Sequence, residues 1–165
     1  MAEEVRYDVD GYELVTDALR ALIDQYPALD RGETFSFSML DENGGKAIFP
    51  TTGAVIQREI ESITGHVTQT CLYPFTVVYR LSGLSQKRKV SAKEWLDTFA
   101  RWLEKQTVKV NGESVVLREY PELTGSREIR NMTRQTPAYL SSVNDNKSED
   151  WVISMVVEYR NEFDK

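Results

Sequence analysis

The sequence has little cysteine or histidine and no long hydrophobic run. Cys71 is the only cysteine and His66 the only histidine among 165 residues. One cysteine excludes an internal disulfide and fits a reducing compartment, and one histidine excludes a histidine-rich metal site. No apolar run approaches the roughly 18 residues that a membrane-spanning helix needs. The acidic N-terminal segment lacks the apolar stretch of a secretory signal, so we expect an intracellular protein that does not cross a membrane.

Positive charge is also scarce. The chain has 20 Lys and Arg against 26 Asp and Glu, which gives a net charge of −6. A general nucleic-acid-binding protein needs a basic face to neutralise phosphates, and this balance argues against one. An acidic wall would still suit a pore through which DNA passes without sticking, although the same charge also serves solubility alone. The 41% hydrophobic and 28% charged residues indicate one globular domain over residues 1–165.

Two segments have the apolar spacing of amphipathic helices. The first covers residues 11–26, with Asp10 as the predicted N-cap of a capping box. The second covers residues 91–106, with Ser91 as the predicted N-cap after a turn at residues 83–89. The second helix carries an apolar stripe formed by Trp95, Phe99, Trp102 and Leu103.

Strict alternation of apolar residues predicts strands. The clearest strand is Cys71–Leu81, in which Pro74 indicates a sheet edge or a bulge. Residues 54–63 are ambiguous between helix and strand, and we favour a strand because it could then pair with Cys71–Leu81. Further strands are predicted at Thr34–Leu40, in a hairpin over 108–120 that turns at Asn111 and Gly112, at Glu128–Arg134 and at Trp151–Arg160. This order predicts an α+β fold with a mainly antiparallel β-sheet packed with two α-helices.

Two polar regions interrupt these patterns. Asp41–Gly45 is dense in turn residues and predicts a hairpin or a mobile loop. Residues 121–150 form a weakly patterned polar loop or arm region, which could become ordered in an assembly or could be plainly disordered. Candidate arm residues are Met132, Arg134 and Tyr139.

No catalytic, cofactor-binding or metal-binding residue is predicted, and we expect no enzyme activity. His66 follows Gly65 in an expected turn, without a serine or cysteine nucleophile beside it. Cys71 lies on the apolar face of its strand and is expected to be a buried structural residue. The segment Asn43–Gly45 lacks the spacing of a phosphate-binding loop. The acidic pairs Glu59 with Glu61 and Glu119 with Glu122 are indistinguishable from solvated surface carboxylates.

Two further features have both a functional and a structural interpretation. The basic segment Gln86–Lys89 could touch DNA phosphates or an acidic neighbouring subunit, but we favour a solvated turn. The tryptophans Trp95, Trp102 and Trp151 could anchor an interface, but their regular spacing favours the core.

Three segments together resemble the minor capsid or tail terminator (tail-to-head joining) protein family of long-tailed phages, the siphophages. They are FTVVYR at Phe75–Arg80, EWLDTFARWLEKQ at Glu94–Gln106 and WVISMVVEYRNEF at Trp151–Phe163. The segment IQREIESITG at Ile56–Gly65 is also similar, except that the family's doubled glycine is a single Gly65 here. The resemblance covers most of the chain and is weakest after Tyr120.

The resemblance implies a virion structural protein without catalytic residues, located at the head–tail junction and assembled in the host bacterial cytoplasm. The implied form is a hexameric ring at the head-proximal end of the tail tube. Such a ring would end tube polymerisation and contact the major tail tube protein and the head connector or stopper protein. DNA would pass through its lumen without specific binding. We hypothesise that Asp41–Pro50 and Pro121–Asp150 are the mobile contact segments.

Three alternatives stay open at this point. The chain could be another head–tail connector component, such as a stopper or head-completion protein. It could be a small enzyme with paired carboxylates, although no such constellation stands out. It could also be a non-catalytic small-ligand-binding α+β module, with an aromatic pocket around Tyr73, Phe75 and Trp95.

Overall fold

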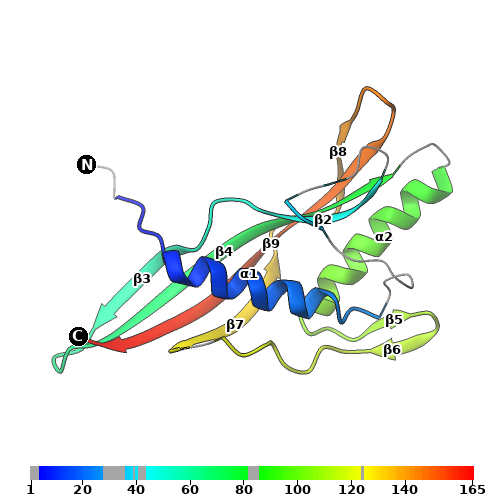
Figure 1. Cartoon of the computed structure of the whole chain (residues 1–165). Helices are drawn as coiled ribbons and strands as arrows, with labels where there is room; N and C mark the ends of the chain where they lie inside the picture. The colour runs from blue at the N-terminus through cyan, green and yellow to red at the C-terminus, as the bar shows by residue number, and fades with distance from the viewer. Residues whose placement is uncertain (1–3, 28–35, 39, 41–43, 82–85, 124) are drawn as a thin grey trace.

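The computed structural model describes residues 4–27, 36–38, 40, 44–81, 86–123 and 125–165, and for residues 86–90 it describes the backbone only. Within these ranges the chain forms two helices and nine strands (Figure 1). Their bounds are α1 Val9–Ile23, β1 Ser36–Phe37, β2 Gly45–Pro50, β3 Val55–Glu61, β4 His66–Leu81, α2 Gln86–Leu103, β5 Val108–Val110, β6 Glu113–Val115, β7 Arg127–Arg134, β8 Tyr139–Val143 and β9 Glu149–Asp164.

A seven-stranded sheet organises the molecule around two long central strands. β4 and β9 have 16 residues each and pair antiparallel along their whole length. β2 and β3 pair with successive halves of β4, while β7 and β8 pair with successive parts of β9. All of these pairs are antiparallel, whereas β1 pairs parallel to β2. The predicted α+β class with a mainly antiparallel sheet and two helices is confirmed.

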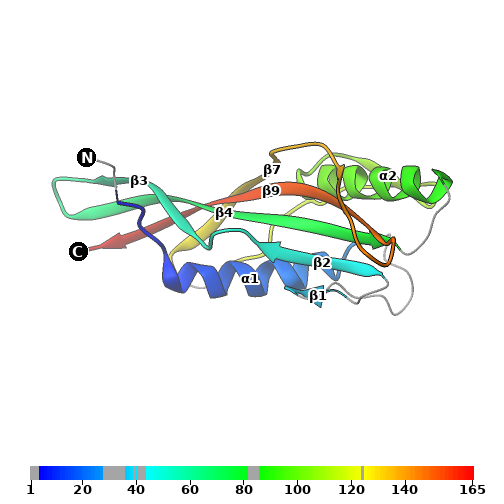
Figure 2. The same ribbon diagram turned by 90° about the horizontal axis from the view of Figure 1, so that it is seen from above.

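The hydrophobic core joins one face of this sheet to the two helices. In Figure 2 the central strands β4 and β9 run between α1 on one side of the view and α2 on the other. Alternation along β4 and β9 places every second side chain on this face, where large apolar side chains are fully buried. Tyr26 follows α1, and its ring packs edge-on against Trp95 and Phe99 of α2. The sheet residues of the core include Cys71, Tyr73, Phe75, Val77, Ile153, Met155, Val157 and Tyr159.

The N-cap of α1 is Asp8, not Asp10 as predicted. The Asp8 carboxylate accepts a hydrogen bond from the Gly11 N–H at 3.2 Å, and Asp10 lies in the first helical turn. Tertiary contacts favour Asp8, because Arg127 and Tyr159 also donate hydrogen bonds to its carboxylate. The helix ends at Ile23, three residues before the predicted position.

The second helix also begins earlier than predicted. α2 starts at Gln86, so Gln86–Lys89 forms helical backbone and Ser91 is an interior helical residue, not a cap. Gln, Lys and Arg are good helix formers, which accounts for the extension. The helix ends with Lys105 at φ 63°, where the Lys105 and Gln106 N–H groups donate to Trp102 and Arg101. This left-handed Schellman arrangement ends α2 within three residues of the predicted end.

Pro74 lies in a central strand, so the prediction of an edge or bulge is wrong. β4 pairs with β9 across Pro74, which lies opposite Val156. On the other side of β4, β2 ends opposite Phe75 and β3 begins opposite Leu72. Pro74 therefore faces the gap between these two strands, where its carbonyl accepts from Thr51 and no partner strand requires a proline N–H.

The two segments proposed as mobile contacts contain sheet strands instead. Gly45–Pro50 is β2, with Ala47 and Ile48 buried in the sheet. Residues Asp41–Asn43 lie outside the described part, as do Thr34, Phe35 and Met39 of the predicted strand Thr34–Leu40, in which Ser36–Phe37 forms β1. Within 121–150, β7 confirms the predicted strand at Glu128–Arg134, and β8 was not predicted.

Two other local predictions are confirmed. Residues 54–63 contain β3, which pairs with β4 as expected. Asn111 and Gly112, with φ angles of 52° and 82°, form the tight turn of the β5–β6 hairpin. Both residues need the left-handed region in this turn, which Asn and Gly tolerate best.

Candidate interaction surfaces

The candidate nucleophile and general base do not form a catalytic pair. His66 is the first residue of β4 rather than a loop residue, and its Nδ1 lies 2.8 Å from the Asp164 carboxylate at the open end of the sheet. Cys71 is fully buried in the core, as predicted. Burial, helped by the nearby Asp8 charge, raises the pKa of the Cys71 thiol to about 11, which keeps it protonated and unreactive at neutral pH.

A buried polar cluster surrounds Asp8. Its carboxylate accepts two hydrogen bonds from Arg127, at 2.9 and 2.6 Å, and one from the Tyr159 hydroxyl at 2.6 Å. Burial alone would raise the pKa of Asp8, but hydrogen bonds from Arg127, Tyr159 and the Gly11 N–H together hold it below its usual value. Burial and the Asp8 hydrogen bond also raise the pKa of Tyr159. All hydrogen-bonding groups of Asp8 are therefore engaged in holding α1 against β7 and β9.

The acidic pairs suggested by the sequence are not coupled acid–base pairs. Glu59 accepts a hydrogen bond from Arg6 at 2.7 Å, and this bond is the main reason that the pKa of Glu59 is lowered. Glu61 is paired separately with Lys165 at 2.9 Å. Each carboxylate thus has its own cation, the arrangement of an ordinary ion pair.

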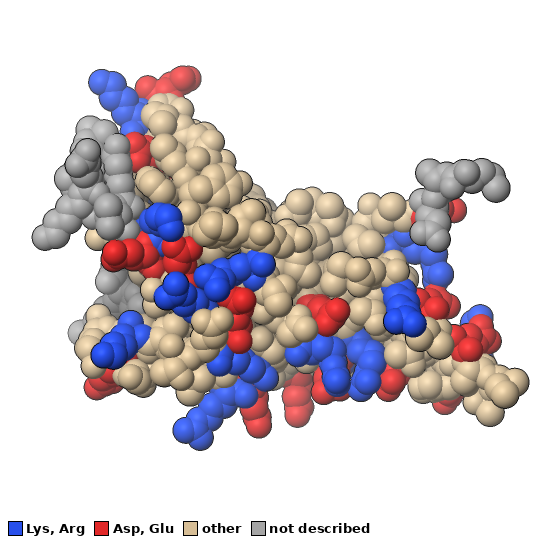
Figure 3. Space-filling model, turned by 180° about the vertical axis from the view of Figure 1, so that it is seen from behind, with Lys and Arg blue, Asp and Glu red and all other residues tan. Residues whose placement is uncertain are grey.

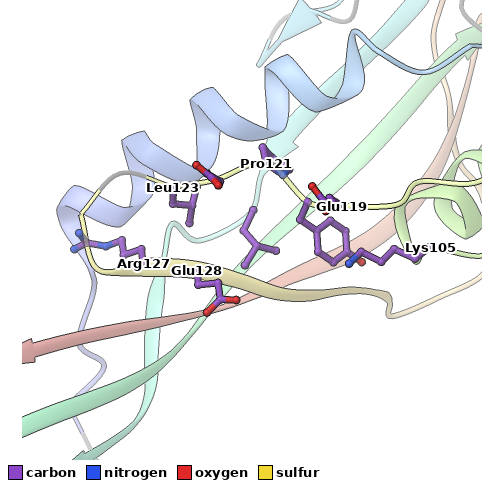
Figure 4. Close-up of a pocket in the computed structure, with 9 residues that line it drawn as sticks. Lys105, Glu119, Pro121, Leu123, Arg127 and Glu128 are labelled. Atoms are coloured by element: carbon purple, nitrogen blue, oxygen red, sulfur yellow. The ribbon is translucent and has the colours of Figure 1, made fainter.

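Glu119 and Glu122 line a cleft with a volume of about 490 Å³ (Figure 4). The cleft lies between residues 119–123, the end of α2 and β7. Lys105, two residues after the end of α2, lines it with its ammonium 4.2 Å from the centre of the Tyr120 ring. Its other lining residues are Pro121, Leu123, Arg127, Glu128 and Ile129. Mixed charges around an open cleft do not define one ligand.

The aromatic pocket proposed for a binding module is absent from the described structure. Tyr73 and Phe75 are fully buried core residues, and the Tyr73 hydroxyl bonds Thr16 at 2.8 Å. Trp95 is half-buried against the core beside a shallow cleft of about 220 Å³. The tryptophans expected in the core follow the prediction, since Trp102 is buried and Trp95 and Trp151 pack against the cluster.

Six exposed large apolar side chains of the described residues lie at two opposite ends of the sheet, while Val5, Tyr7, Val9 and Val116 are exposed elsewhere. The β8 patch consists of Tyr139, Leu140 and Val143, whose exposed fractions are 46%, 41% and 62%. The arm tip, where β3, the start of β4 and the end of β9 extend beyond α1 (Figure 1), exposes Ile60, Ile63 and Phe163. Register places the patches about 13 residues apart along β4, or about 40 Å at the usual rise of a strand.

The candidate arm residues have different environments. Met132 is buried in the core and Arg134 is paired with Glu104, so neither belongs to a free arm. Tyr139 is exposed on β8. The side chains of Gln86–Lys89 lie outside the described atoms. Figure 3 shows acidic and basic side chains mixed on the rear face, without a broad basic area there.

Searches against known proteins do not assign the chain to a family. No family model matches the sequence, and no curated protein matches it. Neither described helix is long and apolar enough to cross a bilayer. Among the described residues, no group of three or more His, Cys, Asp or Glu side chains is placed to hold a metal ion.

The features that sequence reasoning missed include the β2 and β8 strands and the Asp8 cluster. The signal for β8 is weak, because YLSSV alternates poorly and its two serines resemble a loop. The Asp8 cluster joins residues 119 and 151 positions apart. No local pattern could indicate those contacts.

Proposed function

We propose that the protein is a non-catalytic virion structural component, a tail terminator of a long-tailed phage. It forms a ring at the head-proximal end of the tail tube, ends tube polymerisation and joins the tail to the head connector. The observation that carries this proposal is the pair of exposed apolar patches at opposite ends of one sheet. A ring built from identical copies needs two different contact surfaces on each copy, as these patches provide.

The three segments that resemble the phage family also support the proposal. Phe75–Arg80 and Trp151–Phe163 lie in the central strands β4 and β9, and Glu94–Gln106 covers most of α2 and its C-terminal cap. α2 contacts both central strands. The segments on which the resemblance depends therefore form one packed unit rather than scattered matches.

The overall charge suits the proposed location. A net charge of −6 disfavours tight binding to DNA passing through a ring, because phosphates and the wall repel each other. The two contact segments suggested by the sequence contain strands, β2 in one and β7 and β8 in the other, so folded surfaces of the sheet would make contacts of the ring.

Solution mass tests the proposal directly. Light scattering should show a particle of six times the 18.9 kDa chain, either alone or after addition of the major tail tube protein. Substoichiometric addition to polymerising tube protein should shorten the tubes seen by electron microscopy. A chain that stays monomeric and leaves tube length unchanged would contradict the proposal. Binding to the connector alone would favour a stopper.

A further inference from the structure

The sheet has open edges on both sides. On the β4 side, β1 covers β2, and the segment Arg6–Asp8 bonds to the first residues of β3. On the β9 side, Tyr120 accepts a hydrogen bond from the Met132 N–H and thereby contacts the outer edge of β7. Within the described residues, Gln57–Glu61 of β3 and Tyr139–Val143 of β8 have no strand beyond them, and β1 and most of β7 at the two ends of the strand order are also open.

β8 lacks side-chain protection against pairing. Exposed edge strands usually carry charges or proline, which discourage another strand from adding. β8 contains neither in its five residues, and it exposes Tyr139, Leu140 and Val143 instead. Such an edge can accept an additional strand through main-chain hydrogen bonds, while its apolar side chains become buried.

From these edges we propose that β8 of one copy adds to the open edge of β3 in a second copy, so that the sheet continues between subunits. This inference rests on the proposed ring-forming function and names its contact surface. Strand directions support it, because β3, β4, β9 and β8 alternate in direction across the sheet. When two copies lie side by side in the same orientation, β8 and the neighbouring β3 are antiparallel, the more stable pairing.

Charge also favours a second copy of the chain as the partner of the β8 edge. Two chains with a net charge of −6 repel each other least where the contact is neutral, and β8 carries no charge. The acidic residues of the receiving edge already have cations, since Glu59 pairs with Arg6 and Glu61 with Lys165. A basic partner would gain nothing from the uncharged β8.

The register sets the distance between neighbouring copies. β3 lies opposite Val67–Leu72 of β4, while β8 lies opposite the part of β9 that pairs with Val78–Leu81. The neighbouring copy is therefore displaced by about ten residues along the strands and by four strand spacings across the sheet. Together these displacements give a distance of about 40 Å between neighbouring copies. Six such steps close on a circle with a radius of about 40 Å, measured to the subunit centres. A ring of this size encloses a central space.

Cysteine cross-linking tests the contact. Leu140→Cys and Ile60→Cys are prepared as separate variants, and Val116→Cys, at another exposed apolar position, is the matched control. Because the native Cys71 is buried, it should contribute only background cross-linking. After mixing with a short bismaleimide, with and without tail tube protein, we expect at least tenfold more dimer from L140C with I60C than from L140C with V116C.

The other outcomes separate the possible failures. Dimer from L140C alone would indicate symmetric β8–β8 pairing and overturn the proposed pairing with β3. A hexamer by light scattering without the L140C–I60C product would overturn the strand contact and leave the proposed function intact. A chain that stays monomeric in both conditions would overturn the proposed function and this inference together.

Discussion

Replacing Asp8 by asparagine should test the buried cluster that holds α1 to the sheet. The Asp8 side chain is 7% exposed and that of Arg127 is 15% exposed, so water cannot replace the lost partner. Asparagine can still cap the helix, and the change therefore isolates the charge. Leaving one member of a buried ion pair without its partner costs about 3–5 kcal/mol. Because asparagine keeps one acceptor, we expect a loss at the lower end, about 3 kcal/mol.

Thermal and urea unfolding, followed by circular dichroism, measure this loss. For a domain of this size, about 3 kcal/mol corresponds to a decrease in Tm of roughly 10 °C. Glu128→Gln is the matched control, because Glu128 is 62% exposed in its contact with Arg130, and we expect a loss of less than about 0.5 kcal/mol. Equal small losses for D8N and E128Q would refute the assignment of Asp8 as a buried structural anchor.

The same cluster predicts a pH dependence. The pKa of Asp8 is lower in the folded protein than its ordinary value of 3.8, so the folded state favours the charged carboxylate. Its contribution to stability is complete above the ordinary value and is lost as the pH falls from there through the folded-state pKa. Wild-type protein should therefore lose more stability than D8N between about pH 5 and pH 2. Parallel acid unfolding curves for the two proteins would contradict this expectation.

Three further changes have defined outcomes. Gly11→Ala should destabilise the protein by about 2 kcal/mol, because the added Cβ would collide with the Asp8 carboxylate, although alanine usually favours a helix. Urea unfolding measures this loss, and a more stable variant would contradict the expected collision. Cys71 should resist a thiol reagent at pH 8 until the protein unfolds, because burial raises its pKa to about 11; rapid labelling of folded protein would contradict its burial. Tyr120→Phe should cost about 1–3 kcal/mol by removing the acceptor of the Met132 N–H, and unchanged hydrogen exchange at Met132 would argue against that bond.

Local sequence patterns determined much of the fold. The alternation in Cys71–Leu81 and Trp151–Arg160 predicted two sheet strands with their core faces, because strand side chains point to opposite faces in turn. Helical spacing predicted the two helices, and Asn111 with Gly112 predicted the β5–β6 turn, because few other residues accept those backbone angles. These features depend on residues close together in the chain.

Tertiary structure alone decided the features that join distant residues. Asp8 rather than Asp10 caps α1 because Arg127 and Tyr159 reach it from β7 and β9. Pro74 is accepted in a central strand because β2 ends and β3 begins beside it.

Tertiary structure also decided that the edges of β3 and β8 are open. The composition of a strand does not show which strands lie beside it. The candidate contact surface therefore depends on the strand order of the folded sheet. The sequence by itself determined which segments could be strands and helices, through the periodicity of their apolar residues. The packing of the whole chain decided which hydrogen-bonding edges remained unpaired.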